Sequence, residues 1–191
     1  MTSPAKPPEL PVVVVLAAGR GERFRAAGGR TGKLEAPLAG RPVLEHVLDA
    51  VARSGLPSHV VRPEHLAHMT LPGMGDSIAS GVSATAGACG WLILPGDLPL
   101  IQADTLRHVA QALMSLPPGH QTVQPRYQEQ RGHPVGFRRP CEAALRALQG
   151  DEGARGVLRQ WPPRWLDVDD EGVVWDVDTP ERLEQAAGRL G

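Results

Sequence analysis

The stretch that decides the fold is Val12-Val13-Val14-Val15-Leu16-Ala17-Ala18-Gly19-Arg20-Gly21, close to the start of the chain. Four valines followed by a leucine are typical of a short strand that is buried on both faces, as in parallel sheets. Gly19 and Gly21 carry no Cβ atom, so the backbone after the strand can approach a bound anion closely. We therefore expect a buried strand that ends in a ligand-binding loop.

Strands and helices alternate along the rest of the chain. Further strands are predicted at 58–62, 91–94 and 173–177, with a hairpin formed by 121–126 and 134–138. Helices are predicted at 42–54, from 76 or 77 to about 86, and at 104–116, 141–148, 152–160 and from 180 onward. This alternation predicts an α/β protein with a mostly parallel sheet and helices on both faces. Ligands of such sheets bind beyond the carboxyl ends of the strands.

Length and composition restrict the remaining possibilities. The 191 residues fit one domain, so we expect a disordered or extended lead-in at 1–10 and a single domain over 11–191. The 20 basic and 21 acidic residues give a net charge of −1, which offers no overall field for nucleic acid or an anionic membrane. Two cysteines, no secretory signal and no long apolar run predict a reduced, cytoplasmic protein without a zinc site.

The glycine loop does not match two well-known phosphate-binding motifs. A dinucleotide fingerprint requires a third glycine where Phe24 stands. A P-loop requires four residues between its glycines, but only three separate Gly28 from Gly32, and Leu34 follows Lys33 where Ser or Thr is needed. What remains is a glycine loop with two later cations, Arg23 and Lys33. They suit a triphosphate, although solvated surface charges explain them equally well.

Two aspartates follow predicted strands. Asp97 lies in the apolar segment Leu94-Pro95-Gly96-Asp97-Leu98, and Asp178 precedes Thr179 at a predicted helix start. Because both are expected at one sheet edge, they could share Mg²⁺, which takes one or two protein carboxylates. A helix cap is the alternative for Asp178, although Thr179 is the better cap. Asp176 is the weaker candidate.

Six motifs in order give the chain a family resemblance. They are Leu16-Ala17-Ala18-Gly19-Arg20-Gly21-Glu22-Arg23 with Lys33, Gly73-Met74-Gly75-Asp76-Ser77-Ile78, Pro95-Gly96-Asp97-Leu98-Pro99, Arg131-Gly132-His133-Pro134-Val135, Gly150-Asp151-Glu152-Gly153-Ala154-Arg155 and Asp176-Val177-Asp178-Thr179-Pro180-Glu181. Over residues 12–187 the chain resembles the nucleotidyltransferases of molybdenum cofactor maturation. The resemblance implies a Rossmann-like three-layer nucleotidyltransferase fold, an NTP substrate and Mg²⁺.

The resemblance also implies a role for individual residues. It assigns catalysis to Arg23, Lys33 and Asp97, and metal binding to Asp97 and Asp178. The residues assigned to nucleotide binding are Leu16, Ala17, Ala18, Gly19, Gly21, Gly75 and Ser77. His133 and Arg155 are candidates for the acceptor side, although His133 also fits a plain turn residue. Asp151 is a further candidate for the border of the acceptor pocket, but a helix cap explains it equally well.

Base preference follows from the branch of the family. Ala18 and the Gly73–Ser77 motif look more like the cytidylyltransferase branch, so CTP is favoured over GTP. The chain departs from the family in a long glycine-rich loop at 26–32 and in a short 56–72 segment, where one βα unit is expected to be trimmed.

The predicted reaction moves a nucleoside monophosphate from the NTP to a phosphate-bearing acceptor, the pterin of molybdenum cofactor, and releases pyrophosphate. The alternatives are the same transfer from GTP, a transferase acting on a sugar phosphate or another acceptor, and a nucleotide-binding regulator without turnover. The expected partners are the NTP, the small acceptor and, transiently, an enzyme that receives the cofactor.

Overall fold

The computed structural model describes residues 10–19 and 21–190. The predicted lead-in lies outside this part of the chain except for Leu10, which is exposed. Within the described residues, no helix combines the length and the apolar character that crossing a bilayer requires.

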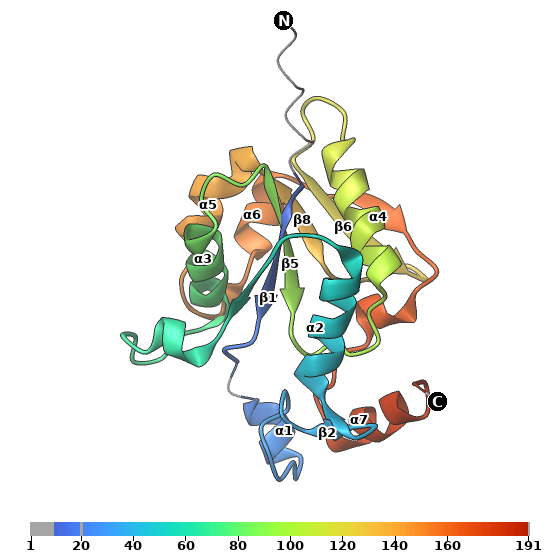
Figure 1. Cartoon of the computed structure of the whole chain (residues 1–191). Helices are drawn as coiled ribbons and strands as arrows, with labels where there is room; N and C mark the ends of the chain where they lie inside the picture. Colours follow the sequence, from blue (N-terminus) through green and yellow to red (C-terminus); the bar gives the residue numbers. More distant parts are fainter. Residues whose placement is uncertain (1–9, 20, 191) are drawn as a thin grey trace, which may run out of the picture.

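A seven-stranded sheet forms the centre of the molecule (Figure 1). Its strands are β1 (Val12–Leu16), β4 (Ser58–Val61), β5 (Gly90–Pro95), β6 (Thr122–Tyr127), β7 (Gln130–Arg131), β8 (Val135–Arg138) and β9 (Arg164–Asp167). Their order is β4-β1-β5-β8-β6-β7, and β9 pairs with β6. Because β8 is antiparallel to both β5 and β6, β6 runs in the direction of β5. Only β7 and β8 run against β1, β4, β5, β6 and β9, which confirms a mostly parallel sheet.

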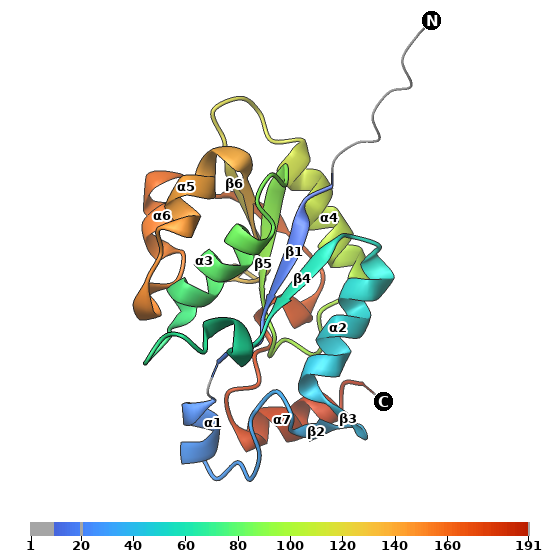
Figure 2. The ribbon, with the colours of Figure 1, turned by 60° about the vertical axis from the view of Figure 1, so that its left-hand side comes forward.

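Helices cover both faces of this sheet, as predicted. One face packs against α2 (Val43–Ser54) and α4 (Ala103–Met114), the other against α3 (Met74–Ala84), α5 (Glu142–Arg146) and α6 (Arg155–Gln160) (Figure 2). Successive residues of a strand point to opposite faces. Val13 and Val15 of β1 accordingly join the α2–α4 core, whereas Val14 joins the core under α3.

A third, smaller cluster lies beyond the carboxyl ends of the strands. It involves α1 (Glu22–Ala26), the short strands β2 (Pro37–Leu38) and β3 (Arg41–Pro42), and α7 (Pro180–Ala187). Phe24, Leu38 and Trp175 are buried together there. The segment from α1 to β3 and the C-terminal helix α7 therefore lie together below the sheet in the view of Figure 1.

Most predicted elements are found near their expected bounds. The predicted antiparallel pair is present, with Thr122 opposite Phe137 in β6 and β8, and β7 is added beside β6. Gly55 ends α2 in the left-handed conformation, and the Thr179 side chain caps α7. Three short 3₁₀ turns, η2 (Arg139–Cys141), η3 (Gly150–Glu152) and η4 (Glu171–Val174), complete the C-terminal half.

Two predictions of local structure are wrong. The expected strand at 173–177 is replaced by η4 and an irregular segment, because the Val173 nitrogen donates within the turn to the Asp170 oxygen and the Val177 nitrogen donates to the Asp97 oxygen, so no strand ladder forms. The expected start of α3 at 76 or 77 is also wrong. The helix begins at Met74, and the Asp76 carboxylate accepts a hydrogen bond from the Gly73 nitrogen at 2.8 Å.

The segment after β4 is short, as the sequence indicates. A single 3₁₀ turn, η1 (Pro63–Leu66), connects β4 to the loop that enters α3. No further described strand pairs with β4, which is therefore an edge of the sheet. The carboxyl end of β4 is consequently open on its outer side.

Candidate active site

The site lies where β1 and β5 end side by side. The Gly96 nitrogen donates a 3.0 Å hydrogen bond to the Leu16 oxygen, which ties the two loops together. A Cβ atom at position 96 would stand 2.9 Å from that same oxygen, so glycine is required there. This contact holds Asp97 next to the glycine loop, as the sheet-edge prediction requires.

Lys33 joins the two predicted metal-binding carboxylates. Its Nζ atom lies 2.5 Å from Oδ2 of Asp97 and 2.7 Å from Oδ1 of Asp178. Arg23 adds a longer contact, 3.3 Å from Nη1 to Oδ2 of Asp178. Four residues spread over 156 positions of sequence, 23 to 178, thus form one charged cluster.

The glycine-rich loop between α1 and β2 places Lys33 in this cluster. Gly21 has φ +62°, and a Cβ atom there would lie 3.3 Å from the Lys33 nitrogen, so the two ends of the loop are in close contact. Gly29 lies against the buried ring of Phe24, where a Cβ atom would come within 2.2 Å. The long 26–32 insertion is therefore a packed loop that turns the chain back toward the carboxylates.

The last segment of the chain places Asp178. The Val177 nitrogen donates to the Asp97 oxygen at 3.0 Å, so the two aspartates are linked through the backbone. Asp170 anchors the preceding turn, because its buried carboxylate accepts from the Gln102 nitrogen, the Thr105 hydroxyl and the Gly172 nitrogen. Asp178 itself is not the cap of α7, since that role belongs to Thr179.

The charges in the cluster shift one another's pKa values. Burial by itself lowers the pKa of Lys33, but the two carboxylates, Asp97 first, outweigh burial and raise it above its usual value. Burial by itself raises the pKa of Asp178, but Lys33 and then Arg23 outweigh burial and lower it. Both groups are therefore held in their charged forms at neutral pH.

The donor set of the cluster fits a hard divalent cation. Asp97 and Asp178 supply carboxylate oxygens, the ligand type that Mg²⁺ and Mn²⁺ prefer. The Lys33 ammonium lies within hydrogen-bond distance of one oxygen of each carboxylate, which shows that both can face a single positive charge. Within the described residues, no group of three or more His, Cys, Asp or Glu side chains could hold a metal. A metal here would therefore take its remaining ligands from substrate and water.

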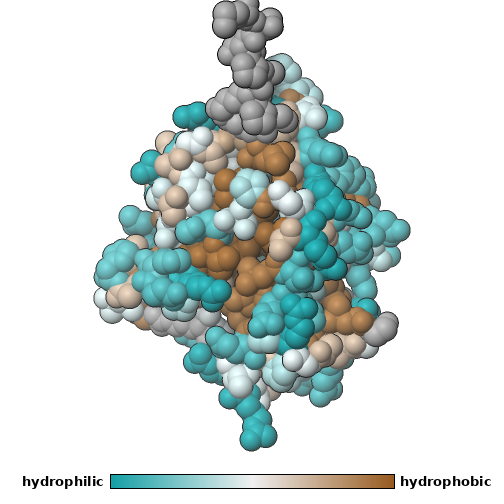
Figure 3. Space-filling view, in the orientation of Figure 1, coloured by the Kyte–Doolittle hydropathy of each residue, from teal (hydrophilic) through white to brown (hydrophobic). Residues whose placement is uncertain are grey.

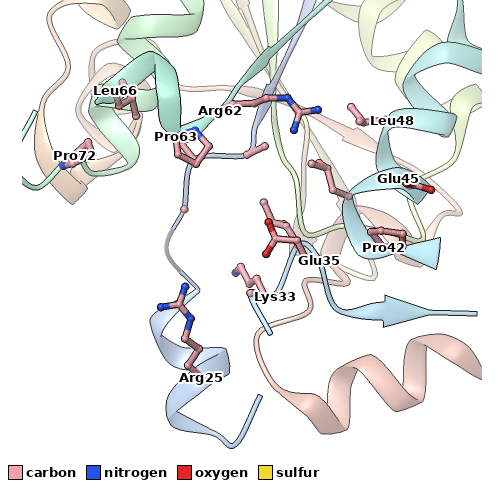
Figure 4. Close-up of a pocket in the computed structure, with 16 residues that line it drawn as sticks. Arg25, Lys33, Glu35, Pro42, Glu45, Leu48, Arg62, Pro63, Leu66 and Pro72 are labelled. Atoms are coloured by element: carbon pink, nitrogen blue, oxygen red, sulfur yellow. The ribbon is translucent and has the colours of Figure 1, made fainter. Parts of the chain in front are cut away.

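A pocket of about 490 Å³ opens from the glycine loop toward β4 (Figure 4). It is lined by Ala17, Ala18 and Gly19, which are predicted to bind the nucleotide, and by Lys33, which is predicted to be catalytic. Sequence reasoning did not find its other lining residues, which are Arg25, Gly32, Leu34, Glu35, Pro42, Leu44, Glu45, Leu48, Arg62, Pro63, Leu66 and Pro72. These residues belong to segments that match no phosphate-binding motif, so their position at the pocket could be found only from the fold.

The two arginines of α1 have different places. Arg23, the predicted catalytic cation, pairs with Asp178 and is not among the pocket-lining residues, whereas Arg25 is. Leu16 ends β1 directly beneath the loop, and Gly21 contacts Lys33. The helical spacing of Arg23 and Arg25 gave no means of telling which one faces the pocket.

Gly75 and Ser77 have packing partners in the protein itself. A Cβ atom at Gly75 would lie 2.8 Å from the Gln149 oxygen, so α3 approaches that loop at backbone contact. The Ser77 hydroxyl donates to the Gly73 oxygen at 3.1 Å. Asp76 links the same parts, because its Oδ2 accepts from Gly73 and Gly150. None of these residues lines the 490 Å³ pocket.

The acceptor-side candidates lie apart from the pocket. The His133 nitrogen donates to the Val173 oxygen at 2.8 Å, and the buried His133 Nδ1 has no hydrogen-bond partner in the described part of the chain. Burial lowers the pKa of His133 despite the opposing charge of Asp97, so its imidazole is held neutral. Arg155 is exposed at the start of α6, and no contact recorded within the described chain links it to the carboxylates.

Comparison with known proteins gives this arrangement a family. Residues 13–165 match the model of the MobA-like NTP transferase domain, which is most of the chain. The chain belongs to the MobA-like NTP transferase family. It is therefore a nucleotidyltransferase that acts on an NTP. Asp178 lies beyond the matched segment, although it completes the charged cluster.

Two curated proteins are similar to this MobA-like transferase in sequence. The purine catabolism protein PucB of Bacillus subtilis is 30% identical over 90% of this chain and 93% of its own length. The chain also matches bifunctional GlmU of Xanthomonas campestris at 35% identity, but spans only 25% of that protein.

Solved structures confirm the fold. Rv0371c of Mycobacterium tuberculosis is 26% identical, with a TM-score of 0.71 over 94% of this chain and 98% of that one. A molybdopterin-guanine dinucleotide biosynthesis protein A from Archaeoglobus fulgidus has the same TM-score and coverage at 18% identity, which shows the fold alone.

Proposed function

We propose that this transferase moves a cytidylyl group from CTP to a phosphate-bearing acceptor, the pterin of molybdenum cofactor, with release of pyrophosphate. The observation that carries the proposal is the Lys33-bridged pair Asp97 and Asp178 beside a pocket lined by the glycine loop. That arrangement offers a base-and-sugar pocket and a charge-neutralising end in one cleft, as nucleotidyl transfer requires.

The reaction requires positioning more than covalent chemistry by the protein. An acceptor phosphate oxygen attacks the α-phosphorus of CTP and forms a new P–O bond. The bond from the α-phosphorus to the bridging oxygen breaks, and pyrophosphate leaves with the electron pair. An acceptor phosphate is already ionised near neutral pH, so no side chain has to remove a proton.

The chain's own residues divide this work. Ala17, Ala18 and Gly19 hold the nucleotide with Leu16 and Gly21 behind them. Lys33, Arg25 and Arg23 offset the negative charge that grows on the leaving pyrophosphate. Asp97 and Asp178 would hold Mg²⁺, which supplies Lewis-acid neutralisation of phosphate oxygens when bound. Gly75, Ser77, His133 and Arg155 stay predictions for the nucleotide and acceptor sides.

CTP is favoured over GTP because the Ala18 methyl group lines the pocket and narrows it toward a pyrimidine. The pterin is proposed as the acceptor because the six sequence motifs resemble the nucleotidyltransferases of molybdenum cofactor maturation. GTP, and a sugar phosphate or other acceptor, are the second candidates. A cytoplasmic location and transient contact with a cofactor-receiving enzyme complete the proposal.

The test is pyrophosphate release by the purified protein with each NTP, Mg²⁺ and the molybdenum cofactor pterin. We expect release with CTP that depends on both the acceptor and the metal. Release with GTP alone would replace the proposed base. Turnover with a sugar phosphate but not with the pterin would replace the proposed acceptor.

A further inference from the structure

Arg62 lines the open end of the pocket and has no protein partner in the described chain. It follows the last residue of β4, the edge strand. Figure 4 shows its guanidinium directed across the pocket toward Leu48. Within residues 10–19 and 21–190, no hydrogen bond or ion pair of this side chain is found, whereas Lys33 is held by two aspartates and Glu45 by Arg41.

The residues around Arg62 are mostly apolar. In Figure 4, Leu48 of α2 lies on one side of the Arg62 guanidinium, and Pro63 and Leu66 of η1 lie on the other. Leu44 and Glu45 of α2 also line the pocket. Figure 3 shows the corresponding hollow as a brown surface on the face that carries β4. A largely apolar cleft with one unpartnered cation at this end suits a heteroaromatic ring with hydrogen-bond acceptors on its edge.

The Arg62 end of the pocket lies away from the carboxylates and therefore has a separate role. Lys33 faces the charged cluster and marks the phosphate end, and Figure 4 shows Arg62 on the opposite side of the pocket from Lys33. A nucleotide with its phosphates near Lys33 therefore has its base near Arg62. This placement rests on the proposed function.

We propose that Arg62 reads the base and selects those that present two adjacent acceptors. A guanidinium only donates hydrogen bonds, and it does so in a fixed fork. Cytosine offers O2 and N3 to such a fork, and guanine offers O6 and N7. Uracil places an N3–H donor beside each of its carbonyl oxygens, and adenine pairs N7 with an amino donor. The site therefore accepts CTP or GTP and rejects UTP and ATP.

The test is equilibrium binding of all four NTPs with Mg²⁺, in the absence of acceptor, to the full chain. We expect the wild-type protein to bind CTP or GTP about 10- to 100-fold more tightly than UTP and ATP, the range for one bidentate contact. Arg62→Met removes the fork, so this preference should disappear through weaker binding of CTP or GTP. Arg62→Gln offers one donor and one acceptor, so the preference should move toward UTP or ATP.

Arg159→Gln, an exposed arginine on α6, is the matched control and should keep the wild-type profile. If the Arg62 variants also keep that profile while NTPs still bind, the role of Arg62 is wrong and the proposed function stands. A wild-type preference for UTP or ATP would likewise overturn the base reading. If the wild-type protein binds no NTP, the proposed function fails as well.

Discussion

The two ends of the pocket differ in whether their charged side chains are paired with other groups of the protein. At one end, Asp97 and Asp178 are neutralised by Lys33 at 2.5 and 2.7 Å, and backbone hydrogen bonds fix the segments that carry them. At the other end, Arg62 faces an apolar cleft with no partner in the described chain. The first end is organised before any ligand arrives, whereas the second is completed by the ligand.

This difference matches the demands of transfer chemistry. Charge stabilisation is most effective where the groups need not reorganise during the reaction, which the linked loops of β1 and β5 achieve. Selection among ligands needs polar groups that lose their hydration only for the right partner. Variants of the charged cluster should therefore affect turnover and stability, and variants of Arg62 should affect nucleotide binding.

The largest effect is expected for Asp97→Asn, which removes one carboxylate of the charged cluster. The amide keeps the shape but loses the charge that Lys33 and a metal require, so pyrophosphate release should fall on the order of 10³-fold. Asp104→Asn, an exposed aspartate on α4, should leave release unchanged. Near-normal turnover in Asp97→Asn would remove this residue from the reaction.

Lys33→Met should come next, because it leaves Asp97 without its cation and Asp178 with only the longer contact to Arg23. We expect the free energy of unfolding to fall by about 2–3 kcal/mol, the scale of lost hydrogen bonds to charged groups. Urea denaturation with and without Mg²⁺ checks the interpretation. A metal held by Asp97 and Asp178 should stabilise this variant more than the wild type, and an equal response would argue against that site.

A pair of glycine variants sharpens the contrast between packing and binding. Gly75→Ala places a methyl group against the Gln149 backbone and should cost about 1–2 kcal/mol of stability. Gly19→Ala meets no atom within 4 Å, so thermal unfolding of the free protein should hardly change. Because Gly19 lines the pocket, its variant should instead bind CTP more weakly, and unchanged binding would place the nucleotide elsewhere.

The smallest effect concerns pH. The lowered pKa of Asp178 means that its ion pairs stabilise the fold above the usual carboxyl pKa of about 4 and are lost as pH falls through the folded value. The raised pKa of Lys33 affects stability only in strong alkali. Asp178→Asn should therefore lower stability by about 1 kcal/mol at pH 7 and by less at pH 3. An equal loss at both pH values, measured by urea denaturation, would show that charge is not the cause.

Local patterns in the sequence were enough for five of the sheet's strands, most helices and the position of Asp97 at the end of β5, whereas Asp178 meets Asp97 without the strand at 173–177 that was expected to place it. A run of valines predicts a strand, and a Thr-Pro pair predicts a helix start, and each does so from a few neighbouring residues. The strand β9 was missed because three of its four residues, Arg164, Trp165 and Asp167, are exposed and show no core pattern. The contacts of Lys33 and the pocket face of Arg25 depend on how a long loop folds back, which residue spacing does not encode.

The carboxylate pair has a consequence for how the protein comes into being. Asp178 reaches Lys33 only through the segment that Asp170 anchors to the start of α4 and that α7 closes against α1. A ribosome adds this segment after every strand of the sheet has been made. The charged cluster can therefore form only once residue 178 has been synthesised, later than all the strands of the sheet.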